Sequence, residues 1–215
     1  LEKADHPYKT PSYFFQSNAF RLSGNMAYAR IVLLNLIKIT RDPLIKNRAH
    51  TMLADLSVES SKGISKADLN AARDHLMAVA GEDKDAYRIP ERLAAVEKAL
   101  DAPEKNPVAA GIAAIIPGGG FLYCERYQDA LVAFLVNAGL IYAAYDAFDD
   151  GNEGLGGVLA FVETGFYTGN IYGSITAAHR RNQIEKIRIL NREFKVFSRV
   201  DVKESALFFG LMADF

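Results

Sequence analysis

Few residues in this sequence are of types and spacings that support catalysis. The four histidines, His6, His50, His75 and His179, are scattered along the chain. Cys124 is the only cysteine, which excludes an intramolecular disulfide and a cysteine-based metal cage. Phosphate-binding glycine loops, dinucleotide-binding motifs, zinc-protease motifs and nucleophile elbows are absent from the sequence. We therefore predict that the protein is not an enzyme and has no catalytic, cofactor-binding or metal-binding residues.

Two polar residues, Asn137 and Glu163, are the candidates for a buried function because they are the polar exceptions inside two long apolar helices. Residues 130–145 are uncharged, and Glu163 is the only charge in residues 154–178. A carboxylate at membrane depth marks a functional site or a wet cavity. The alternative is structural, namely a hydrogen bond from Tyr123, Tyr142 or Tyr167 that only fixes helix packing.

Charge and glycine are segregated along the chain, although the net charge is only -1. Residues 1–106 carry 16 basic and 14 acidic residues, residues 107–178 carry one basic and 7 acidic, and residues 179–215 carry 8 basic and 5 acidic. Twelve of the 16 glycines lie in the middle segment. We predict a water-soluble domain at 1–106, a membrane-associated helical hairpin at 107–178 and a tail at 179–215. The near-zero net charge argues against a nucleic-acid partner.

The middle segment contains the pattern of a membrane helical hairpin. The uncharged stretches 130–145 and 154–178 are near the lower length limit for crossing ~30 Å of hydrocarbon, and an acidic turn joins them. Small residues recur at steps of four and predict close helix packing; they are Gly139, Ala143 and Ala147 on the first helix and Gly165, Gly169, Gly173 and Ala177 on the second. A soluble helix pair packed through small residues is the alternative.

A proline and three glycines precede the hairpin at Pro117, Gly118, Gly119 and Gly120. They exclude a continuous spanning helix over the uncharged residues 107–124. We expect a short helix, a break and a re-entrant turn that ends at Tyr123.

This turn and the motifs that follow it resemble a poorly characterised bacterial family of small membrane proteins. The residues that carry the likeness are Pro117–Tyr123, Arg126, Ala130, Asn137, Glu163, Phe166–Gly173 and Ala177–His179. In that family a Pro-Gly-x-Gly-x-x-Tyr turn precedes a two-helix hairpin, and helical repeats often precede the turn. The resemblance implies membrane association in a bacterial envelope and no reaction.

The first 106 residues have apolar positions at helical spacing, divided by turn signals into about five helices. Ser65 and Asp68 predict a capping box at one helix start. The segment from Gly24 through Ala29, Leu33 and Leu36 to Asp42-Pro43 resembles one tetratricopeptide unit, which would place a partner-binding surface here. An unrelated helical bundle with the same periodicity is the alternative.

The tail combines a basic helix with an apolar terminus. Residues 179–195 form a basic amphipathic pattern in which Arg180, Arg181, Lys186 and Arg188 could meet anionic lipid headgroups, unless the helix packs on the first domain. Residues 207–215 alternate with a period of two and predict a short C-terminal strand that would pair with another chain.

These patterns together predict an all-α protein: a tetratricopeptide-like helical repeat domain, a glycine-rich membrane helical hairpin and a short C-terminal strand. Its expected role is that of a membrane-anchored envelope scaffold or accessory subunit, which docks other proteins of an envelope complex and forms homo- or hetero-oligomers. The alternative is a component of a transport or membrane-insertion assembly, in which Glu163 and the Pro117–Gly120 turn line a polar path. The sequence leaves inner and outer membrane unresolved.

Overall fold

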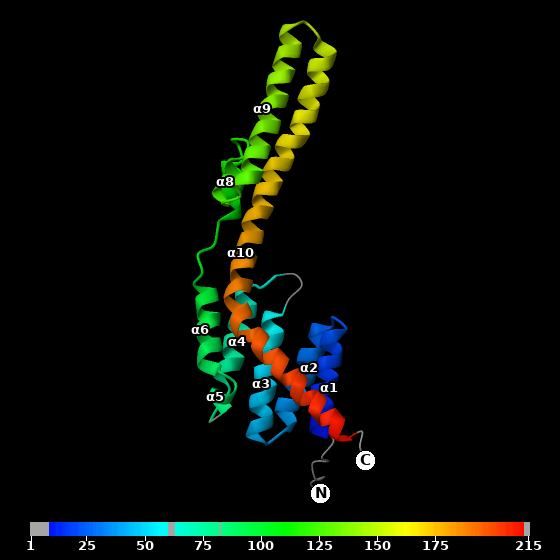
Figure 1. The fold of residues 1–215 in the computed structure, drawn as a ribbon, viewed down its shortest axis with the longest axis vertical. Helices are drawn as coiled ribbons and strands as arrows, with labels where there is room; N and C mark the ends of the chain where they lie inside the picture. Colours follow the sequence, from blue (N-terminus) through cyan, green and yellow to red (C-terminus); the bar gives the residue numbers. More distant parts are fainter. Residues whose placement is uncertain (1–8, 60–62, 82, 213–215) are drawn as a thin grey trace. The chain divides into compact units, whose positions relative to one another are not determined.

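The protein is helical throughout the part described by the computed structural model, which covers residues 9–59, 63–81 and 83–212, with only the backbone described for Lys9 and residues 195–212 (Figure 1). The helices in chain order are α1 (Lys9–Leu22), α2 (Met26–Ile39), α3 (Pro43–Val58), α4 (Lys66–Met77), α5 (Asp83–Ala86), α6 (Ile89–Leu100), α7 (Pro107–Ala113), α8 (Gly119–Tyr123), α9 (Tyr127–Asp149) and α10 (Glu153–Met212). They divide into two compact units, residues 1–102 with 185–215, and residues 103–184. The segment after residue 184 thus groups with the first domain.

The first unit is a series of helices that pack in chain order, α1 on α2, α2 on α3, α3 on α4 and α4 on α6. One buried cluster joins α1, α2 and α3 around Ala29, Leu33 and Leu53. A second cluster joins α3, α4 and α6 and includes Leu190 and Phe194 of α10. Burial of these apolar side chains stabilises the unit and holds the C-terminal helix segment in its core.

Local signals in the sequence set the helix boundaries of this unit. Gly24 has a φ of +79° and allows the chain to leave α1, after which the Asn25 side chain accepts a hydrogen bond from the Tyr28 amide at the start of α2. Asp42 caps α3 ahead of Pro43. The predicted capping box is confirmed, because Ser65 and Asp68 cap each other's backbone amides at α4.

In the second unit, α9 and the first part of α10 run side by side in opposite directions (Figure 1). Gly151 has a φ of +74°, and the Asn152 amide donates to the Ala147 carbonyl, so the chain reverses within a few residues. The Phe148 ring covers Gly156, where an added Cβ would lie 2.7 Å from a ring carbon. The reversal therefore depends on glycine at two positions.

The predicted C-terminal strand is wrong over residues 207–212, which belong to α10; residues 213–215 lie outside the described residues. The prediction failed because apolar side chains occupy both sets of alternating positions from Leu207 to Met212. A short apolar run of this kind does not distinguish a strand from a helix.

Candidate functional site: the α9–α10 helix pair

The α9–α10 pair packs through small and polar side chains. On α9 the buried residues are Ala130, Asn137, Ala144 and Ala147. On α10 the buried residues up to Ala177 are Gly156, Glu163, Asn170, Ser174 and Ala177. Steps of seven within each set place them on one face, as in a left-handed pair of supercoiled helices. The Ala, Gly and Ser residues of these sets have side chains small enough for two helix backbones to approach closely.

Only part of the small-residue pattern predicted from steps of four packs within the chain. A Cβ added to Gly139, Gly165 or Gly169 would meet nothing within 4 Å. Steps of four advance ~40° each around a helix, so the stripe turns by ~120° between Gly165 and Ala177. The C-terminal end of the α10 stripe is packed, since Ala177 is buried and a Cβ on Gly173 would lie 2.8 Å from the Phe121 ring. On α9, Ala143 is half-buried.

The break in the helix at Pro117–Gly120 is held against α10 by Asn170. The Gly118 amide donates to Asn170 Oδ1 at 3.2 Å, and Asn170 Nδ2 donates to the Ala114 carbonyl at 2.8 Å. Gly118 itself has a φ of +81°. Sequence reasoning did not select Asn170, although an amide inside an apolar segment is the same signal that selected Asn137.

The glycines of this turn are required by close contacts. A Cβ on Gly118 would lie 2.3 Å from the Ala130 carbonyl oxygen, and one on Gly119 would lie 2.3 Å from that of Ala113. At Gly120 a Cβ would lie 2.3 Å from the Ala110 carbonyl oxygen and 2.4 Å from the Ser174 side chain. The turn is therefore a packed element of the second unit.

Tyr123 ends the turn and fixes the segment that leads into it. Its hydroxyl accepts a hydrogen bond from the Asn106 amide at 3.1 Å, and the Lys105 ammonium lies 4.9 Å from the centre of its ring. The Asn106 side chain in turn caps α7. Tyr123 thus holds the first residues of the second unit through its contacts with Lys105 and Asn106.

Asn137 and Glu163 are buried without a full set of partners. Asn137 is 2% exposed, and its Nδ2 donates to the Ala133 carbonyl of its own helix at 2.6 Å, but its Oδ1 has no donor among the described residues. Glu163 is 9% exposed, and neither carboxyl oxygen has a donor there. Such groups are costly in a closed environment.

The tyrosine partners proposed for Glu163 are used elsewhere or exposed, so that interpretation is wrong for this structure. The Tyr167 hydroxyl donates to the Ile115 carbonyl at 2.8 Å, and Tyr123 lies at Asn106. Tyr142 is exposed. The positions of these three hydroxyls relative to Glu163 depend on how the helices pack, and the sequence does not give that packing.

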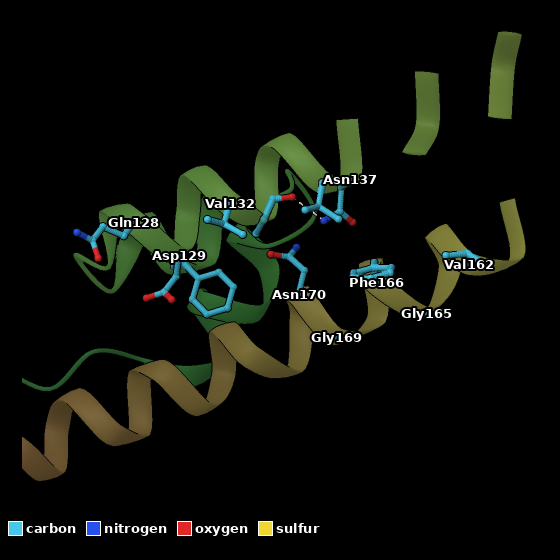
Figure 2. Close-up of a pocket in the computed structure, with 12 residues that line it drawn as sticks. Gln128, Asp129, Val132, Asn137, Val162, Gly165, Phe166, Gly169 and Asn170 are labelled. Carbon is cyan, nitrogen blue, oxygen red and sulfur yellow. Dashed lines mark hydrogen bonds between the residues drawn. The ribbon is translucent and has the colours of Figure 1, made fainter. Parts of the chain in front are cut away.

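A groove runs along the α9–α10 pair beside Asn137 (Figure 2). Its volume is about 720 Å³, and its walls come from α8, α9 and α10; they are Phe121, Gln128, Asp129, Val132, Ala133, Val136, Asn137, Val162, Gly165, Phe166, Gly169 and Asn170. Figure 2 shows Asn137 and Asn170 on the two facing helices, with Gly165 and Gly169 along one wall. Gly165 and Gly169, where an added Cβ would meet nothing within 4 Å, therefore form part of an open groove.

An ion-pair cluster lies at the end of α9 away from the acidic turn. Glu125, with a φ of +61°, accepts from Lys105 at 3.2 Å and from Arg181 at 2.7 Å. The hydrogen bond from Lys105 lowers the pKa of the Glu125 carboxyl. Arg126 pairs with Asp129 at 2.6 Å. The cluster joins the start of the unit to α10.

Only part of the predicted headgroup-binding set is free at the surface. Arg180 and Arg188 are exposed, and Arg181 is half-buried in its pair with Glu125. Lys186 is 5% exposed and donates to the Ile64 carbonyl at 3.3 Å, so the prediction that its ammonium contacts lipid headgroups is wrong. The amphipathic pattern did not reveal this because the burial of Lys186 depends on a loop more than 100 residues away.

Side chains able to do chemistry are sparse in the described residues. His50 and His75 face each other with their Nδ1 atoms 3.3 Å apart, in the first unit. Three or more metal-ligating side chains do not gather anywhere in the part of the chain that the structure describes. Cys124 is buried, and burial raises the pKa of its thiol.

Among the described residues α9 is the one helix that is long and apolar enough to cross a membrane, judged by length and composition. The sequence predicted two such helices. The apolar part of α10 does not qualify because its glycines, Asn170 and Glu163 lower its mean hydropathy. Comparison of the chain with family models, curated proteins and solved structures found no match.

Proposed function

We propose that the protein is a non-enzymatic scaffold or accessory subunit of the bacterial cell envelope, anchored in the membrane by the α9–α10 helix pair and docking partner proteins through its helical first unit. The observation that carries the proposal is the apolar outer surface of the pair. Large apolar side chains are exposed on both helices, among them Leu131, Leu135 and Ile141 on α9 and Val158, Phe161 and Phe166 on α10. Exposed apolar surface of this extent is typical of a contact with lipid or protein.

The charges at the two ends of the pair support a membrane as the environment. From Arg126 to Asp146 the chain spans ~30 Å as a helix, which matches the hydrocarbon thickness. The acidic turn after α9 bounds this length at one end, and the cluster around Glu125 bounds it at the other. Charged groups then lie where water and headgroups are available.

The docking role is supported by the packing of the first unit. Its helices contact their neighbours in chain order, and Ala29 is fully buried where α1 and α3 approach α2. A small residue at such a position lets paired helices pack closely, as in tetratricopeptide-like repeats. Stacked helix pairs present extended surfaces for a partner segment.

A vesicle flotation experiment tests the anchoring role. The double variant Leu135→Asp with Phe161→Asp places a carboxylate on each outer face, at residues that are 59% and 81% exposed. Each charge costs roughly 2.5–3.5 kcal/mol at the centre of a membrane helix, so we expect the variant to lose most of its flotation with phosphatidylcholine–phosphatidylglycerol vesicles.

The matched control is Ile31→Asp, which charges a residue of α2 that is 50% exposed in the first unit. This variant should float like the unaltered chain. Full flotation of the double variant, or failure of the unaltered chain to float at all, would contradict the anchoring role.

The unpartnered Glu163 carboxyl favours a second candidate, a transport or insertion component in which Glu163 and the Pro117–Gly120 turn line a polar path. The turn is hydrogen-bonded to Asn170, which lies seven residues and ~10 Å along α10 from Glu163. This separation argues against one site formed by both Glu163 and the turn. Glu163→Gln discriminates between the two roles. A path should lose transport, whereas a scaffold should keep its assembly.

A further inference from the structure

Residues 105–125, which contain α7 and α8, form an arm that begins and ends at the same point of the second unit. The Lys105 ammonium lies 3.2 Å from a Glu125 carboxyl oxygen and so joins the first residue of the arm to the last. The Asn182 side chain of α10 bonds to the Lys105 amide at 2.8 Å and to its carbonyl at 2.9 Å. With seven residues, α7 is only ~10 Å long, so the arm is too short to cross the ~30 Å core of a bilayer.

One face of the arm packs within the unit, and the other is apolar and exposed. The packed face uses small residues, which are Ala110, Ala114, Gly120 and Cys124. The exposed face consists of large aliphatic side chains that are between 56% and 69% exposed; they are Val108, Ile112, Ile115, Ile116 and Leu122. Residues 107–124 contain no charged, amide or aliphatic hydroxyl side chain. An exposed surface of this composition is typical of a contact with lipid or protein.

The first backbone pair that the break in the arm opens is bonded by a buried side chain. In an unbroken α-helix the Gly118 amide would donate to the Ala114 carbonyl. Both groups bond instead to the side-chain amide of Asn170, which is 4% exposed. The chain thus satisfies this pair without solvent.

The second backbone pair is also bonded within the chain, although it lies beside the exposed face. The Gly119 amide, which would donate to the Ile115 carbonyl in an unbroken helix, donates to the Ile116 carbonyl at 2.8 Å. The Tyr167 hydroxyl of α10 donates to the Ile115 carbonyl at 2.8 Å. In water a solvent molecule can satisfy such a carbonyl, whereas in hydrocarbon each backbone group needs a partner from the protein. The bonds at the break therefore fit a hydrocarbon environment.

The charges near the base of the arm indicate which lipid surface it enters. Four basic residues lie at or beside this base; they are Lys105, Arg126, Arg180, which is exposed, and Arg181. They outnumber the neighbouring acids, which are Glu104, Glu125 and Asp129. The turn at the other end of α9 carries acids alone, from Asp146 to Glu153. Because basic residues attract anionic headgroups, charge complementarity places the base of the arm at an anionic lipid surface.

We propose that this arm inserts into a single lipid leaflet, where its aliphatic face contacts acyl chains and the basic residues at its base contact anionic headgroups. The inference rests on the proposed membrane function and adds a lipid-binding surface outside the α9–α10 pair. The ~10 Å length of α7 fits within the ~15 Å that half of the hydrocarbon core provides. Ile115 and Ile116 then lie deepest, and Val108 lies near the headgroups.

The test uses single tryptophans, because the chain has none of its own. Ile116→Trp places the fluorophore at the break and Val108→Trp places it near the base, at residues that are 69% and 67% exposed. Each full-length variant is reconstituted in phosphatidylcholine–phosphatidylglycerol vesicles, and circular dichroism checks its helix content. Bromines at the ends of the acyl chains should quench Ile116→Trp more strongly, whereas bromines near the headgroups should quench Val108→Trp more strongly. Ile112→Trp, on the same exposed face, replaces Ile116→Trp if that variant loses helix content.

Aqueous iodide separates lipid from water as the surroundings of the arm. Iodide should quench Ile116→Trp about tenfold less than Ile31→Trp, because hydrocarbon excludes the ion. Ile31→Trp is the matched control, since Ile31 is an exposed isoleucine of α2 in the first unit. Brominated lipids should leave this control unquenched.

Energy transfer to labelled lipids tests the base of the arm. A dansyl group on phosphatidylglycerol should receive about twofold more energy from Val108→Trp than the same label on phosphatidylcholine at equal mole fraction. Arg180→Gln in the Val108→Trp chain should lower this ratio towards one.

Three results would overturn the inference. Strong iodide quenching of Ile116→Trp would place the arm in water. Protection of Ile116→Trp from both iodide and brominated lipid would assign its face to another protein or a second copy. Equal transfer from Val108→Trp to the two labelled lipids would remove the role of the base. Flotation of the unaltered chain is measured first, because a chain that floats and gives any of these results contradicts this inference alone, whereas a chain that does not float contradicts the proposed function.

Discussion

At the residue scale, the His50–His75 pair makes the first unit sensitive to pH. Burial lowers the pKa of both imidazoles, Lys46 lowers that of His50 further, and His50 lowers that of His75. Arg30 acts on His75 in the same direction, while Asp74 opposes it. A positive charge on either ring is therefore disfavoured in the folded chain.

This pair predicts a loss of stability in acid. The unfolded histidines bind protons as the pH falls through about 6.5, before the folded ones do, so the free energy of unfolding should decrease below that pH and level off beneath the folded pKa values. Thermal unfolding of the full chain in detergent, followed by circular dichroism between pH 7.5 and 5, measures this. His50→Gln with His75→Gln should flatten the dependence. An unchanged slope in the double variant would contradict the assignment.

At the scale of the elements, the turn before α9 depends on contacts that only glycine permits. Gly120→Ala forces a Cβ against the Ala110 carbonyl and Ser174, and overpacking of this kind costs about 1–3 kcal/mol. In a mixed-micelle titration, we expect the Gly120→Ala variant to unfold at a lower fraction of denaturing detergent than the unaltered chain does. Gly139→Ala is the control because open space surrounds Gly139, and it should be neutral or slightly stabilising. Equal stability of the two variants would show that the turn is not packed as described.

The same turn depends on the Asn170 amide. Asn170→Ala leaves the Gly118 amide and the Ala114 carbonyl without their buried partner, at a cost of about 1–3 kcal/mol for each group. The turn should open, and amide hydrogen exchange of residues 114–120 should accelerate while that of α9 stays slow. Asn152→Ala removes a cap at the start of α10 and should not affect residues 114–120.

At the scale of the whole molecule, α10 contributes to both units. Its first part packs with α9, and its residues Leu190 and Phe194 lie in the core of the first unit. The Arg92 guanidinium lies over the Phe194 ring, 4.3 Å from the centre of that ring. Arg92 is buried and forms an ion pair with Asp55. Glu193 pairs with Arg88 at 2.9 Å. The helix that begins in the second unit therefore completes the core of the first unit.

This shared helix predicts separable effects on stability and membrane binding. Leu190→Ala should destabilise the first unit by about 2–5 kcal/mol, the usual cost of such a truncation in a core. Limited proteolysis should then cut the first unit faster, while vesicle flotation stays unchanged. Ile187→Ala, at an exposed position three residues earlier, should have little effect on either measurement. Protection of the Leu190→Ala variant equal to that of the unaltered chain would contradict the placement of this segment.

Features that depend on near neighbours in the chain can be read from the amino-acid sequence alone. The turn at Gly24, the cap at Asp42 and the capping box of Ser65 with Asp68 follow from backbone conformation and local hydrogen bonds, and the structure has all three. The all-helical class and the apolar length of α9 follow from composition and periodicity in the same way. Such signals need no knowledge of what lies across from them.

Which face of each helix is buried depends on packing between helices. Steps of four and steps of seven both describe small residues on α10, and only the presence of α9 shows that Gly156, Glu163 and Asn170 face it while Gly165 and Gly169 border the groove. The burial of Lys186 and the bonds of Asn170 likewise depend on residues far away in the sequence. Helical periodicity fixes the angles between side chains on one helix. It does not say on which side the neighbouring helix lies. The position of that neighbour is set by packing between segments, and it determines which side chains are buried.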